Sequence, residues 1–308
     1  MEFKNILVDI DTDAESHPAL EQAIDLARYS GARVRIVDVS GFDLVEDGSG
    51  VAAAKAGWIA ERRHRLETFA AAARGLPVEY DLLMGRHPGL RLVQEVLRHQ
   101  HDLLVRSHIR DLKAPKPKGH GAIDMQLFRK CPCPVWTVGP SMRQRPERIV
   151  VAVNTGTNHD EEGGLNVKIV EAALQLARLE ARRLFIVQAW MPFGEQVLRG
   201  RCSREELTTY IEDSRRAAAA AFDGFTATFG KRLEGATFEL LKGFPEDVLP
   251  AYVADHGIEL VVMGTVARSG VPGLLMGNTA ERMLRRLWCS ILAVKPDGFQ
   301  TPVTLEDS

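Results

Sequence analysis

The chain is poor in cysteine, and it has no apolar run long enough to cross a membrane. Its 308 residues include four cysteines, too few for the disulfide framework of a small secreted protein. No apolar stretch approaches the roughly 20 residues that a membrane-spanning helix needs. The N-terminal sequence MEFKNILVDIDTD becomes acidic at once and lacks the basic, apolar and small-residue order of an export signal. We therefore expect a cytoplasmic protein that does not insert into a membrane.

The chain also lacks a strong net charge and the common sequence motifs of catalysis. A formal net charge of −2 gives no electrostatic reason to expect a nucleic-acid partner. There is no Ser-His-Asp order, nucleophile elbow or zinc-protease helix, and the GxxxxGK[ST] phosphate loop of rapid nucleotide hydrolases is absent. We therefore assign no catalytic residue, and any ATP hydrolysis should be slow and incidental.

What the chain does contain is a long internal repeat. The matching segments are 5–8 with 148–151, 23–28 with 173–178, 82–85 with 240–243, 102–105 with 259–262, and 133–140 with 289–296. A repeat of this length indicates a duplicated domain rather than a solenoid unit. We place the first domain at 1–142, the second at 146–300 and a tail at 301–308.

Each repeat alternates short apolar strands with amphipathic helices. This alternation favours right-handed crossovers and a parallel sheet that is covered on both faces. We therefore predict an α/β fold of two tandem doubly wound domains, each a five-stranded parallel sheet of order 3-2-1-4-5 with helices on both faces. Ligands of such sheets bind beyond the strand carboxyl ends, where the strand order reverses. In the second repeat, Asn154 and Gly264 end the two strands that border this crevice.

Residues 258–296 are the most informative stretch of the chain. The apolar run 258–263 predicts a buried strand that Gly264 ends, and a glycine-bearing loop follows. The block Gly277-Asn278-Thr279-Ala280-Glu281 then opens a helix, for which we predict Asn278 as the N-cap. A glycine loop between a parallel strand and a helix N-terminus aims backbone N–H groups at one spot, which suits a phosphate. The alternative is an ordinary connection whose glycines only solve turn geometry.

In this stretch the sequence resembles the universal stress protein family. Nucleotide-binding members carry a glycine, two residues, a second glycine, nine residues, then a glycine and Ser or Thr, just after the fourth strand. This chain has Gly264, Ala267, Gly277 and Asn278 at those spacings. The doubled chain and the ending Lys295-Pro296-Asp297 most resemble the tandem, E-type branch of the family. The resemblance covers essentially the whole chain and is more specific in the second half.

The resemblance implies that the second domain binds ATP or a related adenine nucleotide, with or without Mg²⁺. Gly264 and Gly277 would let the backbone approach the phosphates. The N–H groups of Asn278 and Thr279 would donate to phosphate oxygens, and Arg268 would neutralise charge. The ordinary alternatives are that Asn278 only caps its helix and that Arg268 is a solvated loop charge.

At the base end, the resemblance implies that Asn154 reaches the adenine or the ribose, where nucleotide-binding members usually have Asp. Ala189 would offer main-chain groups to the adenine edge, and Met263 would pack on the ring unless it is only a core residue. Two departures count against binding. Ala267 replaces the second glycine and costs roughly 1 kcal/mol or more if that position needs a positive φ. Asn278 replaces the usual hydroxyl side chain.

The first repeat has lost the motif. Ser107 and His108 stand where the second repeat has Gly264 and Thr265, and Gly121 is retained without a polar pair after it. We therefore predict that this half binds no nucleotide. Because domains of the family commonly associate through the last strand, the resemblance implies an intramolecular pseudo-dimer in which 135–138 lies against 291–294. A further homodimer stays open.

Histidine is concentrated in the first repeat, which holds seven of the nine. The nearby pair Cys131 and Cys133 is spaced more tightly than the paired ligands of a zinc site. Cys133 and Cys289 occupy matched positions and fit small core residues. We therefore assign no metal site; the alternative is a metal in the vacated first cleft, held by Asp11 and His108.

These observations leave two functions to separate. The leading hypothesis is a cytoplasmic stress-response protein that binds ATP or a related adenine nucleotide in its second domain as a sensor or switch. The rival is a nucleotide-independent interaction module or small-ligand, lipid-like carrier in which Ala267 and Asn278 mark a decayed nucleotide site.

Overall fold

The computed structural model describes residues 2–41, 52–107, 120–139, 147–156, 164–177, 183–265 and 276–306. We call residues 2–139 the first half and residues 147–306 the second half. The strands of the first half are β1 (Asn5–Asp9), β2 (Arg33–Ser40), β3 (Val78–Met84), β4 (Leu103–Ser107) and β5 (Val135–Val138). Its helices are α1 (Pro18–Ser30), α2 (Ala52–Ala72), α3 (Pro88–His99) and α4 (Ala122–Lys130).

The second half repeats this order and adds a short helix. Its strands are β6 (Arg148–Val153), β7 (Arg183–Trp190), β8 (Thr237–Lys242), β9 (Leu260–Gly264) and β10 (Ser290–Val294). Its helices are α5 (Leu165–Ala177), α6 (Glu195–Leu198), α7 (Arg204–Ala227), α8 (Pro245–Asp255) and α9 (Asn278–Leu284), with a 3₁₀ turn at Gly230–Leu233.

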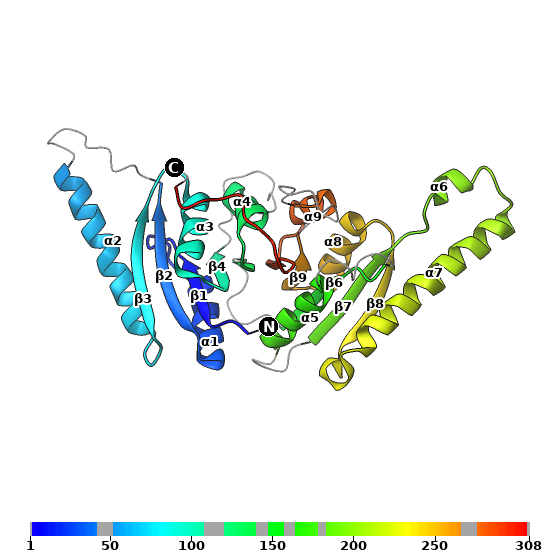
Figure 1. Cartoon of the computed structure of the whole chain (residues 1–308), viewed down its shortest axis with the longest axis horizontal. Coiled ribbons are helices and arrows are strands. Elements are labelled where there is room, and N and C mark those ends of the chain that lie inside the picture. Colours follow the sequence, from blue (N-terminus) through cyan, green and yellow to red (C-terminus); the bar gives the residue numbers. More distant parts are fainter. Residues whose placement is uncertain are drawn as a thin grey trace.

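Within the described residues, the strands of both halves form one ten-stranded sheet (Figure 1). Its order is β3-β2-β1-β4-β5-β10-β9-β6-β7-β8. Neighbouring strands within each half are parallel, for example β1 with β4 and β6 with β9. Among the described strand pairs, only the one at the centre, β5 with β10, is antiparallel. The predicted α/β class is confirmed, and the two halves share a sheet that is mixed as a whole.

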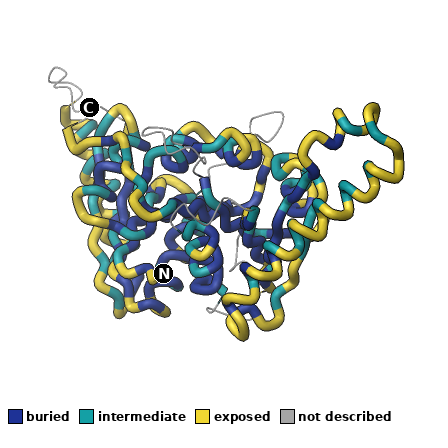
Figure 2. Tube along the Cα trace, turned by 45° about the vertical axis from the view of Figure 1, so that its right-hand side comes forward, coloured by how far each residue is buried: buried dark blue, intermediate teal, exposed yellow. Residues whose placement is uncertain are grey.

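The sheet is buried because its strands are apolar on both faces. Ile6 and Val8 belong to one hydrophobic cluster and Leu7 to the other, as the alternation of a strand requires. Helices α1, α2, α5 and α7 contribute to the first cluster, and α3, α4, α8 and α9 to the second. Figure 2 shows the buried residues concentrated along the sheet. This two-layer cover leaves the strand carboxyl ends as the accessible edge.

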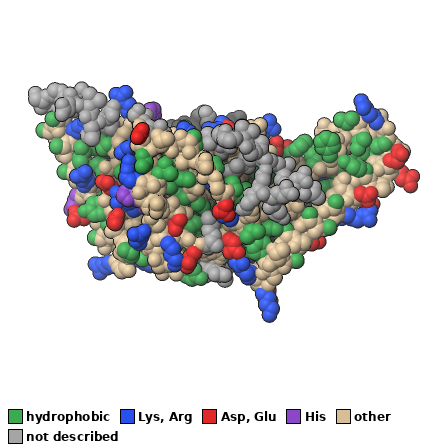
Figure 3. Space-filling view, viewed as in Figure 1, with side chains coloured by type: hydrophobic (Ala, Val, Ile, Leu, Met, Phe, Trp, Pro, Cys, Tyr) green, Lys and Arg blue, Asp and Glu red, His purple; other side chains and the backbone are tan. Residues whose placement is uncertain are grey.

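Helix α6 and the first part of α7 extend away from the sheet as an arm (Figure 1). The α7 helix starts at a capping box in which Ser203 and Glu206 bond each other's backbone N–H. Its buried residues are Phe222 and Phe225, close to its end. Phe193, just before α6, is 92% exposed, and Figure 3 shows hydrophobic side chains over the arm. The arm therefore adds little to the core.

The two halves meet at the strand pair β5 and β10, in which every residue is buried. We call this contact the seam. Trp136, at the centre of β5, is fully buried and pairs with Leu292 of β10. Beside the seam, Lys295 is 3% exposed, and its Nζ donates to the carbonyl of Phe128 in α4. The same Nζ lies 4.6 Å from the centre of the Phe299 ring. Among the described helices, none combines the length and the apolar character that a membrane span requires.

We expect Lys295 to make the protein more stable as the pH rises from about 8 to about 10. Burial lowers the pKa of Lys295 from 10.5 to about 8. Between these values the unfolded chain binds more protons than the folded chain, so the free energy of unfolding rises with pH, by about 3 kcal/mol in full. A Lys295→Met variant should lack this rise. Urea unfolding of both proteins across this interval measures it, and a difference between them that stays constant with pH would contradict the expectation.

Candidate functional site

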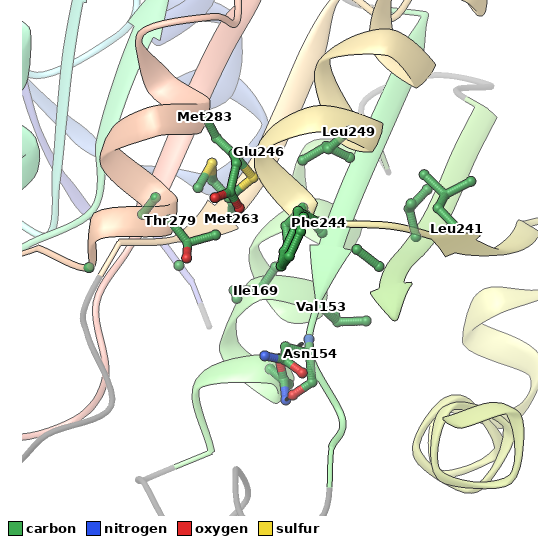
Figure 4. Close-up of a pocket in the computed structure, with 18 of the residues that line it drawn as sticks. Val153, Asn154, Ile169, Leu241, Phe244, Glu246, Leu249, Met263, Thr279 and Met283 are labelled. Carbon is green, nitrogen blue, oxygen red and sulfur yellow. Dashed lines mark hydrogen bonds between the residues drawn. The ribbon is translucent and has the colours of Figure 1, made fainter. Parts of the chain in front are cut away.

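A cavity of about 690 Å³ lies at the carboxyl ends of β6, β7 and β9 (Figure 4). Helices α5, α8 and α9 form its walls. Its lining consists of Ala152, Val153, Asn154, Leu165, Asn166, Ile169, Val187, Ala189, Leu241, Phe244, Pro245, Glu246, Leu249, Met263, Gly264, Gly277, Asn278, Thr279, Ala280 and Met283. The adjacent strands β6 and β9 flank the point where strand order reverses, which is where doubly wound sheets bind ligands.

The fold brings seven of the eight residues singled out in the sequence to this cavity. They are Asn154, Ala189, Met263, Gly264, Gly277, Asn278 and Thr279. Arg268 and the departure from the motif at Ala267 lie outside the described residues. The seven come from three strand ends and one helix N-terminus, so their convergence follows from the parallel sheet and not from proximity in the sequence.

Asn154 is held in place by a neighbouring amide. The side chain of Asn166 in α5 accepts from the Asn154 backbone N–H at 3.1 Å and donates to its carbonyl at 2.8 Å. One residue on, Thr155 donates through its N–H and its hydroxyl to Gln188 Oε1, at 2.9 and 2.7 Å. These bonds fix the turn after β6 and leave the exposed Asn154 side chain at the cavity.

Ala189 presents main-chain groups to the cavity. The carbonyl of the next residue, Trp190, accepts from Gly243 N–H at 2.8 Å, on the β8 side. Because successive peptide groups of a strand point to opposite sides, the N–H and C=O of Ala189 point toward β6. The β6–β7 ladder ends at the pair Val153 and Gln188. The N–H of Ala189 forms this last pair by donating to the Val153 carbonyl, so the C=O of Ala189 is the group that lies past the ladder and can pair with a ligand.

Gly264 has a structural reason to be glycine. It is the last residue of β9, opposite Val294. A Cβ at this position would come within 2.8 Å of Leu165 Cδ2 and 3.4 Å of Ile169 Cδ1. A larger residue would force the Leu165 side chain of α5 to move, because the Cβ contact is too short. The close approach of α5 thus accounts for this glycine whether or not a phosphate binds.

The prediction that Asn278 is the N-cap of its helix is wrong. Gly277 is the N-cap, with φ −70° and ψ 142°, and its carbonyl accepts from Glu281 N–H at 2.9 Å. The helix therefore begins one residue earlier than expected, and Asn278 is its first helical residue. Gly277 N–H donates to the carbonyl of Thr265 at 3.0 Å, which fixes the start of α9 against the end of β9. Asn278 therefore does not cap the helix, and it lines the cavity.

Several lining residues were missed from the sequence, and Phe244 and Glu246 are the most prominent. Phe244 is 50% exposed, and it precedes α8, in which Glu246 lies in the first turn. Both follow β8, whose carboxyl end lies at the same edge of the sheet. The Leu-Leu-x-Gly repeat marked that strand end at Gly243, so the signal was present in the sequence. In the view of Figure 4, Phe244 projects between Asn154 and the group around Met263.

The equivalent residues of the first half contact one another. The ladders pair Asp9 with Arg106 in the first half, where the second half pairs Ala152 with Met263. Arg106 Nε lies 3.4 Å from Asp9 Oδ2 and 3.3 Å from Asp124 Oδ1, and these three side chains are 5 to 12% exposed. Burial raises the pKa of Asp9 to about 6, against the opposing charge of Arg106.

Arginine also covers the strand ends of the first half. Arg62 of α2 binds Asp38 at 2.5 Å, forms an ion pair with Asp13 and lies 3.7 Å from Asp11. Its guanidinium stacks 4.6 Å from the centre of the Trp58 ring. The matched positions of the second half are neutral, because Gln188 and Asn154 replace Asp38 and Asp11 in the repeat. The first half thus occupies its strand-end edge with its own ion pairs.

The first half contacts α9, the helix that carries the end of the glycine motif. Thr265 Oγ1 donates to the carbonyl of Phe128 at 3.3 Å. Arg129 forms an ion pair with Glu281 at 2.6 Å. His120 Nδ1 lies 3.3 Å from the carbonyl of Leu284 at the end of α9. Both the first turn and the last residue of α9 are therefore braced across the seam.

No metal cluster is formed by the part of the chain that the structure describes, in which no three His, Cys, Asp or Glu side chains are placed to hold an ion. His108 lies outside that part. The Cys131 and Cys133 sulfurs are 3.5 Å apart, and burial raises the pKa of the Cys133 thiol well above its ordinary value. Burial likewise raises the pKa of Cys289 to about 12. The Cys133 and Cys289 thiols therefore pack as neutral core groups.

The fold and the cavity define a class of protein: two doubly wound α/β units in tandem, sharing one sheet, with a cleft at the switch point of the second. Known families contain this arrangement. The family model described as "Universal stress protein family" matches residues 2–139 and again residues 147–295. The chain belongs to the universal stress protein family and carries two copies of its domain.

Individual relatives match over the whole chain. Universal stress protein E of Escherichia coli K12 is 29% identical over 321 aligned residues, which cover 99% of this chain and 98% of that protein. The protein of the same name from Photorhabdus laumondii is 28% identical and covers 98% of each.

Solved structures share the fold. A functionally unknown protein of Pseudomonas aeruginosa PAO1 aligns over 96% of this chain and 93% of its own, with a TM-score of 0.68 and 24% identity. A universal stress protein from Archaeoglobus fulgidus covers 96% and 98%, with a TM-score of 0.63 and 13% identity.

Proposed function

We propose that this universal stress protein binds ATP or another adenine nucleotide in the second-half cleft and acts in the cytoplasm as a sensor or switch of the stress response. The observation that carries the proposal is the convergence of Asn154, Ala189, Met263 and the Gly277 turn on one cavity. Its volume, about 690 Å³, falls in the range of small-molecule and cofactor sites.

The two ends of the cleft suit the two ends of a nucleotide. The Ala189 carbonyl can accept from the amino group at the edge of an adenine, because it lies past the end of the β6–β7 ladder. Met263 is 1% exposed in the free protein and lines the cavity, and Phe244 offers a half-exposed ring to stack on a base. Asn154 can donate to and accept from the ribose.

The opposite end of the cleft carries Gly277, Asn278 and Thr279. Asn278 and Thr279 are the first residues of α9, and their backbone N–H groups have no intrahelical partners, so they can donate to phosphate oxygens. The Gly277 N–H is used by the Thr265 carbonyl, and the small glycine leaves space for the phosphates. Arg268 supplies a positive charge to this end in the proposal, and Mg²⁺ can accompany the phosphates. The proposed role is binding, with at most slow hydrolysis of the nucleotide, because the chain lacks the phosphate loop of rapid nucleotide hydrolases.

The first half is proposed to bind no nucleotide and to pair with the second as a pseudo-dimer. Support comes from Arg106, which lies between two carboxylates at the position that Met263 occupies in the second half. The antiparallel β5–β10 pair supports the pseudo-dimer. The contacts of Arg129 and Thr265 with the opposite half support a bracing role for the first half in the cleft of the second.

Isothermal titration of the purified chain with MgATP, ADP, AMP and adenosine tests the proposal. We expect saturable binding with a stoichiometry of one per chain, since only the second half keeps the motif. A second equivalent site would overturn the assignment of the first half, and no binding of any of these ligands would overturn the nucleotide proposal itself.

A second candidate function rests on the apolar character of the cleft. Most of its lining is aliphatic, sulfur-containing or aromatic, including Ile169, Leu241, Leu249 and Met283, and such a surface also suits an acyl chain. In this alternative the chain is a nucleotide-independent carrier or interaction module. Native mass spectrometry of freshly purified protein separates the two, because a retained nucleotide supports the first function and a retained lipid supports the second.

A further inference from the structure

One charged side chain lines the cleft among its described residues, and it is a carboxylate. Glu246 belongs to the first turn of α8, and its side chain is 15% exposed. The other described polar side chains of the lining are neutral: Asn154, Asn166, Asn278 and Thr279. In Figure 4 the Glu246 carboxylate points into the cavity beside Thr279, Met263 and Met283. A ligand that extends toward α9 therefore meets a negative group.

The cation that offsets this carboxylate stands on the outer side. Arg282 Nη1 donates to Glu246 Oε1 at 3.1 Å, and the Arg282 side chain is 67% exposed. Arg282 lines a second cavity, of about 530 Å³, together with Arg285 and Arg286. Glu246 borders both cavities, so it stands between the cleft and these arginines. The arginines are thus shielded from the cleft by the carboxylate that one of them binds.

The position of Glu246 is set by the fold and not by a ligand. Phe244 is the N-cap of α8 and Pro245 its first helical residue. A carboxylate in a first helical turn interacts favourably with the helix dipole. The bond to Arg282 then ties α8 to α9 on the outer side of the cleft. The carboxylate is therefore built into the wall before any ligand arrives.

We infer that Glu246 ranks the ligands of the cleft by their charge. This inference rests on the proposed nucleotide function. Each phosphate charge added to an adenine ligand increases its repulsion from the carboxylate, whereas adenosine feels none. A divalent cation on the phosphates offsets their charge and is itself attracted to the carboxylate. Glu246 is thus a specificity-determining residue that admits a polyphosphate chiefly as its Mg²⁺ complex.

A Glu246→Gln variant tests the inference because it keeps the shape of the side chain and removes its charge. Titration at about 0.15 M ionic strength should show Mg²⁺-free ATP binding about tenfold more tightly to the variant than to the wild type. AMP should gain about threefold, and adenosine should not change. With Mg²⁺ present, the gain for ATP should fall toward unity. Equal gains for all three ligands, or no gain for ATP, would overturn the inference.

Asp247 provides a matched control one residue further along α8. Its side chain is 60% exposed, binds Arg286 at 2.5 Å and lines only the second of the two cavities. Asp247→Asn removes the same charge from the same helical turn, and it should change every affinity by less than about twofold, because the exposed charge is screened. A charge-dependent gain as large as that of Glu246→Gln would show that bulk charge, and not the position of Glu246, ranks the ligands.

Arg282→Gln supplies a second variant that keeps the inference falsifiable. Removing its guanidinium leaves Glu246 without its partner, so ATP should bind more weakly, and the double variant with Glu246→Gln should recover this loss. If the wild type and all variants bind adenosine but Glu246→Gln leaves ATP unchanged, the charge ranking fails and the nucleotide site stands. If no adenine ligand binds any of them, the proposed function fails, and the inference fails with it.

Discussion

An Arg106→Met variant should lose about 3–5 kcal/mol of unfolding free energy, because it leaves two buried carboxylates without their cation. Asp9 and Asp124 are 12% and 5% exposed, and both lie within 3.4 Å of Arg106 Nε. Methionine is the residue of the second half at this position, so it fits the sheet. Urea unfolding at about pH 7.5 measures the loss. A variant as stable as the wild type would show that the ion pairs contribute nothing to folding.

The matched control replaces the whole group by its counterpart. Asp9→Ala, Arg106→Met and Asp124→Ala together reproduce Ala152, Met263 and Ala280 of the second half. The triple variant should recover most of the loss, because buried ion groups can be replaced by apolar residues at little cost. It should remain about 1 kcal/mol below the wild type, since Asp124 accepts from the Gly121 N–H at the start of α4.

The loss in the single variant should grow with pH. In the wild type, burial raises the pKa of Asp9 to about 6, so the folded chain binds protons more tightly than the unfolded chain. The contribution of Asp9 to stability is therefore most favourable below about pH 4 and is lost as the pH rises through about 6. Removal of Arg106 takes away the charge that opposes this shift, so the loss should be smaller at about pH 5 than at about pH 7.5.

The fold could be predicted from the sequence because its signals repeat. Apolar strands at matched spacings imply parallel crossovers, and parallel crossovers place the strand ends at one edge. Asn154 and Gly264 were placed at the crevice in this way, although 110 positions separate them in the sequence, whereas Ala189 and Met263 were named from the family resemblance. The order and direction of the strands are enough to place residues at these strand ends, without any knowledge of side-chain packing.

The residues that were missed depend on the direction in which a side chain packs. Phe244 lies in a loop and Glu246 on a helix, and neither strand alternation nor helix periodicity says which way such residues point. The N-cap was misplaced for a related reason: Asn278 has the better capping side chain, but the bond from Gly277 N–H to the Thr265 carbonyl fixes where the helix begins. Tertiary contact overrode the local preference.

The strand ends of the two halves differ in charge at matched positions. Arg106 and Met263 occupy the same position of equivalent strands. Arg106 forms ion pairs with two carboxylates, whereas Met263 lines the cavity of the second half. Arg106 alone looked unremarkable in the sequence, because its partners Asp9 and Asp124 lie on other elements. The ion-pair group of the first half thus depends on three positions that only the fold connects.

A Gly277→Val variant should lower the affinity for MgATP by roughly 100-fold, about 2.7 kcal/mol. Gly277 has φ −70° and ψ 142°, an extended conformation that valine adopts readily, so the substitution adds bulk without backbone strain. The added methyl groups would stand at the N-terminus of α9, where the proposal places the phosphates. Titration calorimetry of the variant with MgATP measures the loss, and adenosine, which lacks phosphates, should lose much less.

Gly121 is the matched position of the first half and provides the control. It is the N-cap of α4 with φ −72° and ψ 177°, and a Cβ there would meet only Asp124 Oδ2, at 3.9 Å. Gly121→Val should therefore cost about the same stability, roughly 1 kcal/mol as for other N-caps, and leave MgATP affinity within about twofold. Equal losses in the two variants would mean that the phosphates do not bind at α9. If only Gly277→Val loses affinity for MgATP, the ligand needs the space beside Gly277. The loss would then not reflect a general need for glycine at the start of a helix.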